Sequence, residues 1–172
     1  MKRAAFATVI ALVMVVLLLE AYPWLSWKYW HWKNNHVLSL RGYRVDIPER
    51  FIVNVLGQVS TLVVDARPRL VNARLLHPQI AFLRSRPDPQ LRANIALETR
   101  VDQSGKQLLP IDTIAGEKAR CFTDDSLSAT LQNKDALTGN CVTEGGLLIL
   151  LSGMKEDLPD LLQVVSTTTK SN

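Results

Sequence analysis

Few side chains of this chain have the types and spacing that chemistry requires. Ser152-Gly153-Met154-Lys155 has the Ser-x-x-Lys spacing, which on a helix places a lysine amine one turn from a serine nucleophile. The Ser-Asp-Asn and Lys-Thr-Gly motifs that accompany this pattern in acyl-transfer enzymes do not follow it. Gly153 is typical of a turn between a strand and a helix. We therefore predict no catalytic residue in this motif.

The remaining polar side chains do not form a recognisable site either. His77 has no partner at metal-ligand spacing. Asp124 and Asp125 supply too few oxygens for calcium and are typical of a turn. No phosphate-binding glycine loop, Gly-x-Ser-x-Gly or His-Glu-x-x-His motif is present. We expect no catalytic residue, no metal and no cofactor. The alternative is an enzyme in which His77, Asp124, Asp125 and arginines of residues 67–86 converge in the fold.

Cys121 and Cys141 are the two cysteines of the chain. A disulfide between them would close a loop of about 20 residues, which the chain-entropy model values at roughly 3 kcal/mol. Two cysteines with no nearby histidine are too few for zinc, and their spacing is not that of a Cys-x-x-Cys redox pair. The alternative is two unpaired buried thiols. We predict the disulfide, which requires an oxidising compartment.

The first 33 residues have the composition of a membrane anchor. Lys2 and Arg3 precede the apolar run Ala4–Leu19, which with the next residues approaches the length of about 20 that a spanning helix needs. Aromatic residues that prefer the headgroup layer follow, and Lys28 and Lys33 among them suit anionic lipid. The residues expected at the membrane interface are Tyr22, Trp24, Trp27, Trp30 and Trp32.

A cleavable signal peptide is the competing interpretation of this segment. Leu19-Glu20-Ala21 is a poor small-x-small cleavage site, which favours a retained anchor. We expect a single-pass protein of the inner (cytoplasmic) membrane with its C-terminal domain on the exocytoplasmic side. Cleavage would instead give a secreted protein. The basic N-terminus supports this orientation weakly, because Lys28 and Lys33 lie close on the other side, and the cysteines add to it.

The formal net charge of +4 is unevenly distributed. Residues 41–100 contain ten arginines and five acidic residues, whereas residues 101–172 contain six basic and ten acidic residues. Such a basic segment could contact an anionic partner, or its charges could pair with those of the acidic half. The candidate anionic contacts are Arg67, Arg69, Arg74, Arg84 and Arg86. Nucleic acid is not an expected partner, because the tryptophans that could stack on bases belong to the N-terminal segment.

The rest of the chain is long enough for one domain. We expect a short connector at 34–41, a single α+β domain at 42–168 and a polar tail at 169–172. Tyr43, Val45 and Ile47 alternate with polar residues, as in a half-buried strand. Further strands are expected at Phe51–Leu56, Thr61–Ala66, Ile80–Leu83, Lys118–Phe122, Leu127–Leu131, Cys141–Thr143 and Leu147–Leu151. Helices are expected at Arg69–His77, from Leu91 and from Asp157.

These elements predict an α+β fold: an N-terminal transmembrane helix followed by a mostly antiparallel sheet covered by two or three helices. Gly42-Tyr-Arg-Val-Asp-Ile-Pro48, a central helix, Ile114-Ala-Gly-Glu-Lys-Ala-Arg-Cys121, a hairpin into Leu147–Leu151 and a closing helix occur in this order. The order over residues 42–168 resembles the PsbP-like α/β/α sandwich domains, which include small exported bacterial proteins and photosystem extrinsic subunits. The resemblance implies an accessory or binding role and assigns no functional residue.

The sequence thus favours a membrane-anchored exocytoplasmic accessory or binding protein without catalysis. Membrane lipid and a membrane or envelope protein are its expected partners. The alternatives are the fold-assembled enzyme above and a lipid-contacting module that uses the tryptophans and arginines together. The sequence does not predict an oligomeric state.

Overall fold

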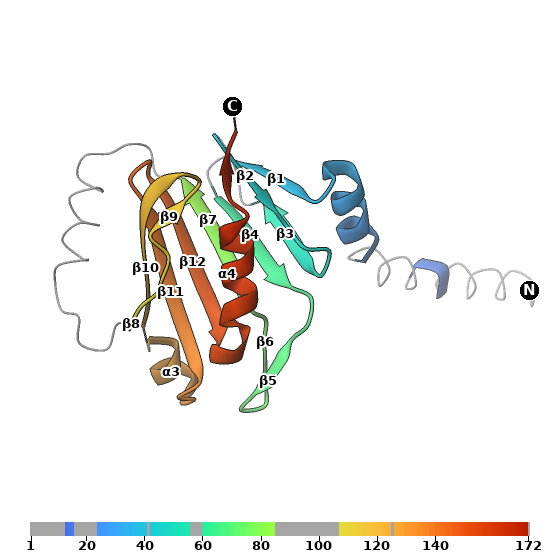
Figure 1. The fold of residues 1–172 in the computed structure, drawn as a ribbon. Coiled ribbons are helices and arrows are strands. Elements are labelled where there is room, and N and C mark those ends of the chain that lie inside the picture. The colour runs from blue at the N-terminus through green and yellow to red at the C-terminus, as the bar shows by residue number, and fades with distance from the viewer. Residues whose placement is uncertain are drawn as a thin grey trace, which may run out of the picture. The chain divides into compact units, whose positions relative to one another are not determined.

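The structure is a computed structural model that describes residues 13–15, 24–40, 42–55, 60–84, 107–124 and 126–171. It divides into two units, residues 1–36 and 37–172, which are described separately below. In the first unit, residues 13–15 are helical and residues 24–34 form a helix. The second unit contains the strands and the remaining helices (Figure 1).

The second unit is built on a large antiparallel sheet. Across the sheet, the main strands are β3 (Phe51–Val55), β4 (Ser60–Asp65), β7 (Gln79–Arg84), β12 (Leu147–Met154), β11 (Ala136–Thr143), β10 (Glu117–Asp124) and β8 (Gln107–Leu108), and β9 (Thr113–Ile114) also pairs with β10. Side chains of alternate residues along β4, β7, β10, β11 and β12 are buried, as the period of two of a strand requires. The expected strands within residues 51–66, 80–83, 118–122 and 141–151 are therefore confirmed.

One face of this sheet carries the hydrophobic core. Register places Cys121 opposite Cys141, Cys141 opposite Ile149, and Ile149 opposite Phe82, and all four side chains are buried. Helix α4 (Leu158–Ser166) lies over this sheet (Figure 1) and contacts β12. Pro159 in its first turn fits a helix start, as the sequence predicts. Its buried residues are Leu161, Val164 and Val165.

A second, three-stranded sheet contains β1 (Val37–Leu40), β2 (Tyr43–Asp46) and β13 (Thr169–Lys170). The alternation predicted around β2 is confirmed, because Tyr43, Val45 and Ile47 are buried. The expected connector at 34–41 contains β1, and the expected polar tail at 169–172 contains β13. Both segments pair with β2, so long-range hydrogen bonding gives structure to stretches that lack a local pattern.

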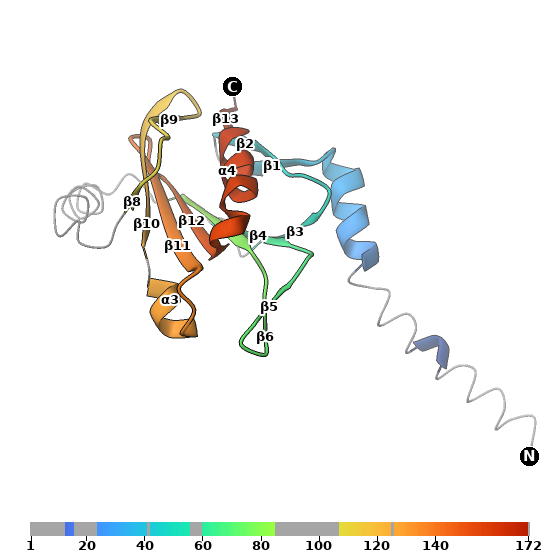
Figure 2. The ribbon, with the colours of Figure 1, turned by 60° about the horizontal axis from the view of Figure 1, so that its bottom comes forward.

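Two local predictions are wrong. Residues 69–77, expected as a helix, form an antiparallel ribbon of β5 (Arg69–Val71) and β6 (Arg74–Leu76), because Asn72 and Ala73 turn the chain with positive φ. Residues 127–131, expected as a strand, lie in the short helix α3 (Ser126–Leu131), which contacts β11. Figure 2 shows α3 and the ribbon near the same end of the second unit. The helix expected from Leu91 lies outside the described residues.

The predicted membrane topology also requires correction. Within the described residues, no helix is long and apolar enough to cross a membrane, since helix 24–34 carries Lys28 and Lys33 and residues 13–15 are three positions of the apolar run. The structure therefore does not support the transmembrane part of the predicted fold class or the single-pass inner-membrane location. Tyr22 and the rest of Ala4–Leu19 lie outside the described residues.

Candidate functional site

The Ser-x-x-Lys motif does not form a catalytic pair. Ser152 lies on strand β12, where it is paired with Thr138 and Gln79. The chain is extended there and does not form a helical turn, so the spacing of three residues does not place the Lys155 amine beside the Ser152 hydroxyl. Lys155 begins the 3₁₀ helix η1 (Lys155–Asp157). Its Nζ donates a 2.8 Å hydrogen bond to the carbonyl oxygen of Lys134.

The residues of the alternative enzyme site are also kept apart. His77 lies before β7, and its Nδ1 is 3.0 Å from the carbonyl oxygen of Asp65. Asp124 lies on β10 and accepts a hydrogen bond from the Thr138 hydroxyl. Strands β11 and β12 separate β10 from β7, so three strand spacings of about 4.8 Å, or about 14 Å, lie between the two strands. Asp125 is outside the described residues.

The described part of the chain has shallow, polar hollows and no cluster of three or more metal-ligating residues. A hollow of about 390 Å³ is lined by Arg44, Asp46, Thr169, Lys170 and Ser171. A second of about 220 Å³ lies between the β5–β6 ribbon and α3, and its lining includes Val71, Arg74 and Thr130. Neither joins the histidine and carboxylates discussed above.

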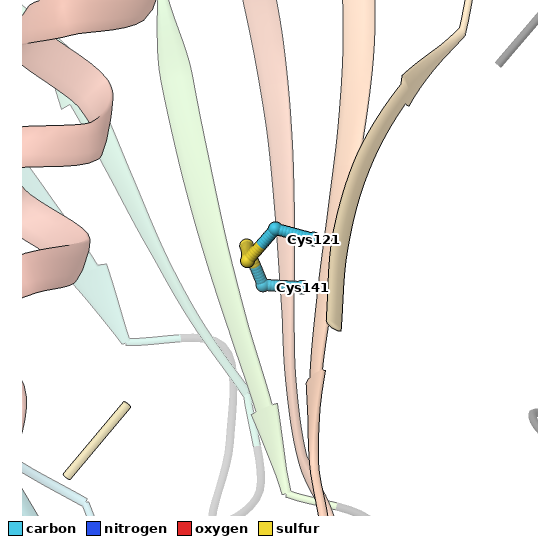
Figure 3. The surroundings of a disulfide bond; sticks show 2 residues. All are labelled: Cys121 and Cys141. Carbon is cyan, nitrogen blue, oxygen red and sulfur yellow. A yellow bond between two sulfur atoms is a disulfide. The ribbon is translucent and has the colours of Figure 1, made fainter. Parts of the chain in front are cut away.

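Cys121 and Cys141 form a disulfide that joins β10 to β11 at directly paired positions (Figure 3). The prediction of this bond is confirmed. Both residues are fully buried, so the sulfurs belong to the core. The bond indicates an oxidising compartment.

The five arginines predicted as anionic contacts differ in whether the described residues give them an ion pair. Arg67 lies 3.4 Å from Asp65, and Arg69 donates 3.1 and 3.0 Å hydrogen bonds from Nε and Nη2 to Asp157. The hydrogen bond that Arg69 donates to Asp157, together with the charge of that carboxylate, raises the pKa of Arg69. Arg74 is exposed and has no ion pair among the described residues. The Arg84 side chain and Arg86 lie outside the described set, so the five arginines do not form one described patch.

The β5–β6 ribbon presents two leucines to solvent. Leu70 and Leu75 are directly paired across the two strands and therefore share a face. Their exposed fractions are 74 % and 67 %. The neighbouring Val71, on the other face, is only 5 % exposed. The ribbon thus has a buried side and an apolar side that described residues leave uncovered.

Two contacts on either side of this pair fix the ribbon to the rest of the unit. Arg69 on β5 pairs with Asp157, which is 5 % exposed and also accepts a 3.1 Å hydrogen bond from the Met154 backbone N–H. At the turn, Asn72 Nδ2 donates a 2.8 Å hydrogen bond to the carbonyl oxygen of Leu131 in α3. The leucine pair is consequently held at a defined position. Sequence reasoning missed it, although Asn72 between two leucine-containing stretches is a turn signal.

A second carboxylate, that of Glu117, whose side chain is 12 % exposed, connects the two sheets of this unit. Glu117 accepts 3.0 Å hydrogen bonds from the Tyr43 hydroxyl and the Gly145 N–H, and lies 3.1 Å from Lys170 Nζ. Burial by itself raises the pKa of Glu117, but hydrogen bonds from Thr143, Lys170, Tyr43 and Gly145 outweigh it and lower the pKa. The cluster joins β2 and β13 to the β10–β11–β12 edge of the large sheet.

The helix at 24–34 in the first unit has two different faces. Leu25, Tyr29 and Trp32 are spaced i, i+4 and i+7 and therefore form one stripe. Their exposed fractions are 49 %, 55 % and 78 %. On the other side, Trp27 and Trp30 are half-buried and meet the buried His31 ring edge-on. The four tryptophans predicted at the interface are therefore not equivalent.

The helix ends in a specific cap. His36 has φ of 61° and its backbone N–H donates to the carbonyl oxygen of His31 at 3.1 Å. The two Nδ1 atoms of His31 and His36 are 2.9 Å apart, and Asn34 Nδ2 donates to the Trp30 carbonyl oxygen at 2.8 Å. These bonds satisfy the carbonyls of Trp30 and His31 near the end of the helix and hold the His31 and His36 rings together.

Comparison with protein-family models, with curated protein sequences and with solved structures found no match to this chain.

Proposed function

We propose that this chain is a non-catalytic binding protein of an oxidising compartment, an accessory subunit that docks another protein through the β5–β6 ribbon. The observation that carries the proposal is the directly paired, solvent-facing Leu70 and Leu75. Single exposed leucines are ordinary, but an apolar pair on a fixed projection is typical of a docking surface. The buried disulfide supports the compartment.

The partner is a protein surface with an apolar pocket. Leu70 and Leu75 would fill the pocket, because their side chains share the exposed face of the ribbon. The ribbon is fixed before the partner arrives, by Asn72 at its turn and by Arg69 at its base, so little ordering entropy opposes binding.

The test is site-specific photocrosslinking in the cells that make the protein. A photoreactive side chain at position 70 or 75 is expected to capture the same protein, and one at Val55, an equally exposed apolar site on β3, is not. The captured protein is then purified and its affinity for the full chain is measured by calorimetry. L70S/L75S should weaken binding by at least about tenfold, since residues at the centre of an interface contribute more than about 1 kcal/mol each.

The matched control is V55S, which removes a comparably exposed apolar side chain outside the ribbon. Equal capture at position 55, capture of a second copy of this chain, or unchanged affinity of L70S/L75S would each refute the proposal.

A further inference from the structure

The first unit carries a surface that the proposed protein docking does not use. Leu25, Tyr29 and Trp32 lie within about 60° of one another around the helix at 100° per residue. The Tyr29 and Trp32 rings are 5.9 Å apart between centroids, so they form a continuous aromatic surface. Trp24, one residue before the stripe, is 55 % exposed.

The charges beside this stripe have one sign. Lys28 and Lys33 lie on its two borders by the same helical geometry. Lys28 Nζ is 5.1 Å from the Trp27 ring centroid and Lys33 Nζ is 5.8 Å from that of Tyr29, so each lysine extends along an aromatic ring. Residues 24–36 contain two lysines and two histidines and no acidic residue.

From this geometry we infer that helix 24–34 binds an anionic lipid surface, lying in the plane of the interface with Leu25, Tyr29 and Trp32 inserted. Indole and phenol rings prefer the headgroup layer because their polar atoms reach water while the rings enter the acyl boundary. Lysines on both borders reach lipid phosphates when the stripe points into the bilayer. An apolar pocket of a protein would also match the stripe. It would not explain why lysines lie on both borders or why residues 24–36 contain no acidic residue.

This surface contact differs from a membrane span. The eleven described residues 24–34 of this helix span about 16 Å, half of the roughly 30 Å hydrocarbon core, and their stripe fits along the interface. The predicted collar of tryptophans therefore divides into two groups. Trp32 and Trp24 face outward, whereas Trp27 and Trp30 pack around His31 and stabilise the helix.

The test compares two tryptophans of the full chain. One variant keeps Trp32 alone (W24F/W27F/W30F) and the other keeps Trp30 alone (W24F/W27F/W32F). Each is mixed with vesicles of phosphatidylcholine and about 30 % phosphatidylglycerol, with and without bromine on the acyl chains. Contact quenching by bromine is expected to be at least about twofold stronger for Trp32 than for Trp30, because the two side chains lie on opposite faces.

Two charge variants separate local from general attraction. K28Q/K33Q is expected to weaken association with the anionic vesicles by about tenfold or more, since each lysine near such a surface contributes a several-fold factor. K118Q/K134Q removes two exposed lysines of the second unit and gives the same net charge, so it should have little effect. Neither variant should change association with pure phosphatidylcholine.

Several results would overturn the inference. Quenching of Trp32 that is equal to or weaker than that of Trp30 would show that the stripe does not insert, even if other residues bring the chain to the vesicles. An equal loss with K118Q/K134Q would show non-specific attraction. A blue shift of Trp32 that depends on protein concentration without vesicles would assign the stripe to contacts between copies. The result is independent of the ribbon variants, so the two proposals can fail separately.

Discussion

The backbone N–H of Gly145 donates a 3.0 Å hydrogen bond to Oε2 of Glu117, and the two residues are so close that a Cβ at position 145 would overlap both carboxylate oxygens. The Tyr43 hydroxyl would lie against the same Cβ. A side chain at position 145, in the turn between β11 and β12, would therefore force Glu117 and Tyr43 to move. The Glu117 cluster depends on this absence of a side chain.

Replacing Gly145 by alanine should lower the free energy of unfolding by about 1 to 3 kcal/mol, because the methyl group forces Glu117 or the turn to move. Chemical denaturation measures the loss. The matched control is G139A, whose Cβ would make only ordinary contacts with Leu151 and Phe122 and should change stability by less than about 1 kcal/mol. Equal losses in the two variants would contradict a specific steric role of position 145.

Glu117 should make the free energy of unfolding depend on pH. Its pKa is lowered in the folded protein, so the unfolded chain binds its proton more readily and the carboxylate stabilises the fold above the ordinary value of about 4.3. At neutral pH, E117Q should reduce the free energy of unfolding by about 2 kcal/mol. The difference from the wild type should shrink as pH falls below about 4.3 towards the lowered pKa.

Denaturation curves between neutral and acidic pH measure this difference. The control is E144Q, which removes an exposed carboxylate directly before Gly145. Its free energy of unfolding should stay within about 0.5 kcal/mol of that of the wild type at every pH. A difference between E117Q and the wild type that stays constant with pH would show that the ionised carboxylate is not the stabilising group.

Local patterns predicted the elements with a sustained period. Tyr43, Val45 and Ile47 alternate long enough to identify β2, and Glu144-Gly145-Gly146 between two apolar stretches identified the hairpin of β11 and β12. Residues 69–77 and 127–131 are too short for a period to decide between helix and strand, so the turn at Asn72 and the packing of α3 on β11 decide instead.

The candidate surfaces were less accessible to sequence reasoning. Glu117 and Tyr43 are 74 residues apart, and Arg69 and Asp157 are 88 apart, so no local pattern reports either contact. The aromatic residues of helix 24–34 were visible as a cluster, but their division into two faces requires the helix phase. The cysteines were predicted correctly because two residues in one chain leave a single possible intramolecular pairing.

Reduction of the disulfide should destabilise the second unit. C121A/C141A is expected to lose about 3 kcal/mol, because the bond closes a loop with a sequence separation of 20. For a domain of this size the thermal midpoint should fall by about 10 °C. Reductant should lower the midpoint of the wild type and leave that of the variant unchanged. A wild-type midpoint that reductant does not alter, with complete reduction verified by mass, would contradict the prediction.

The contact between Arg69 and Asp157 should control how firmly the leucine ribbon is held. D157N removes the negative charge that accepts hydrogen bonds from both Nε and Nη2 of Arg69, and it weakens the hydrogen bond from the Met154 N–H. Residues 69–76 should therefore open more often. We expect amide hydrogen exchange in the ribbon to accelerate by about tenfold, with little change in β10 and β11, whose disulfide holds them.

E156Q provides the control, because Glu156 is 64 % exposed and lies 3.4 Å from Arg69 Nε without forming the buried pair. If E156Q accelerates exchange as much as D157N, or if D157N accelerates it uniformly across the large sheet, then Asp157 stabilises the unit as a whole and does not specifically fix Leu70 and Leu75 in place.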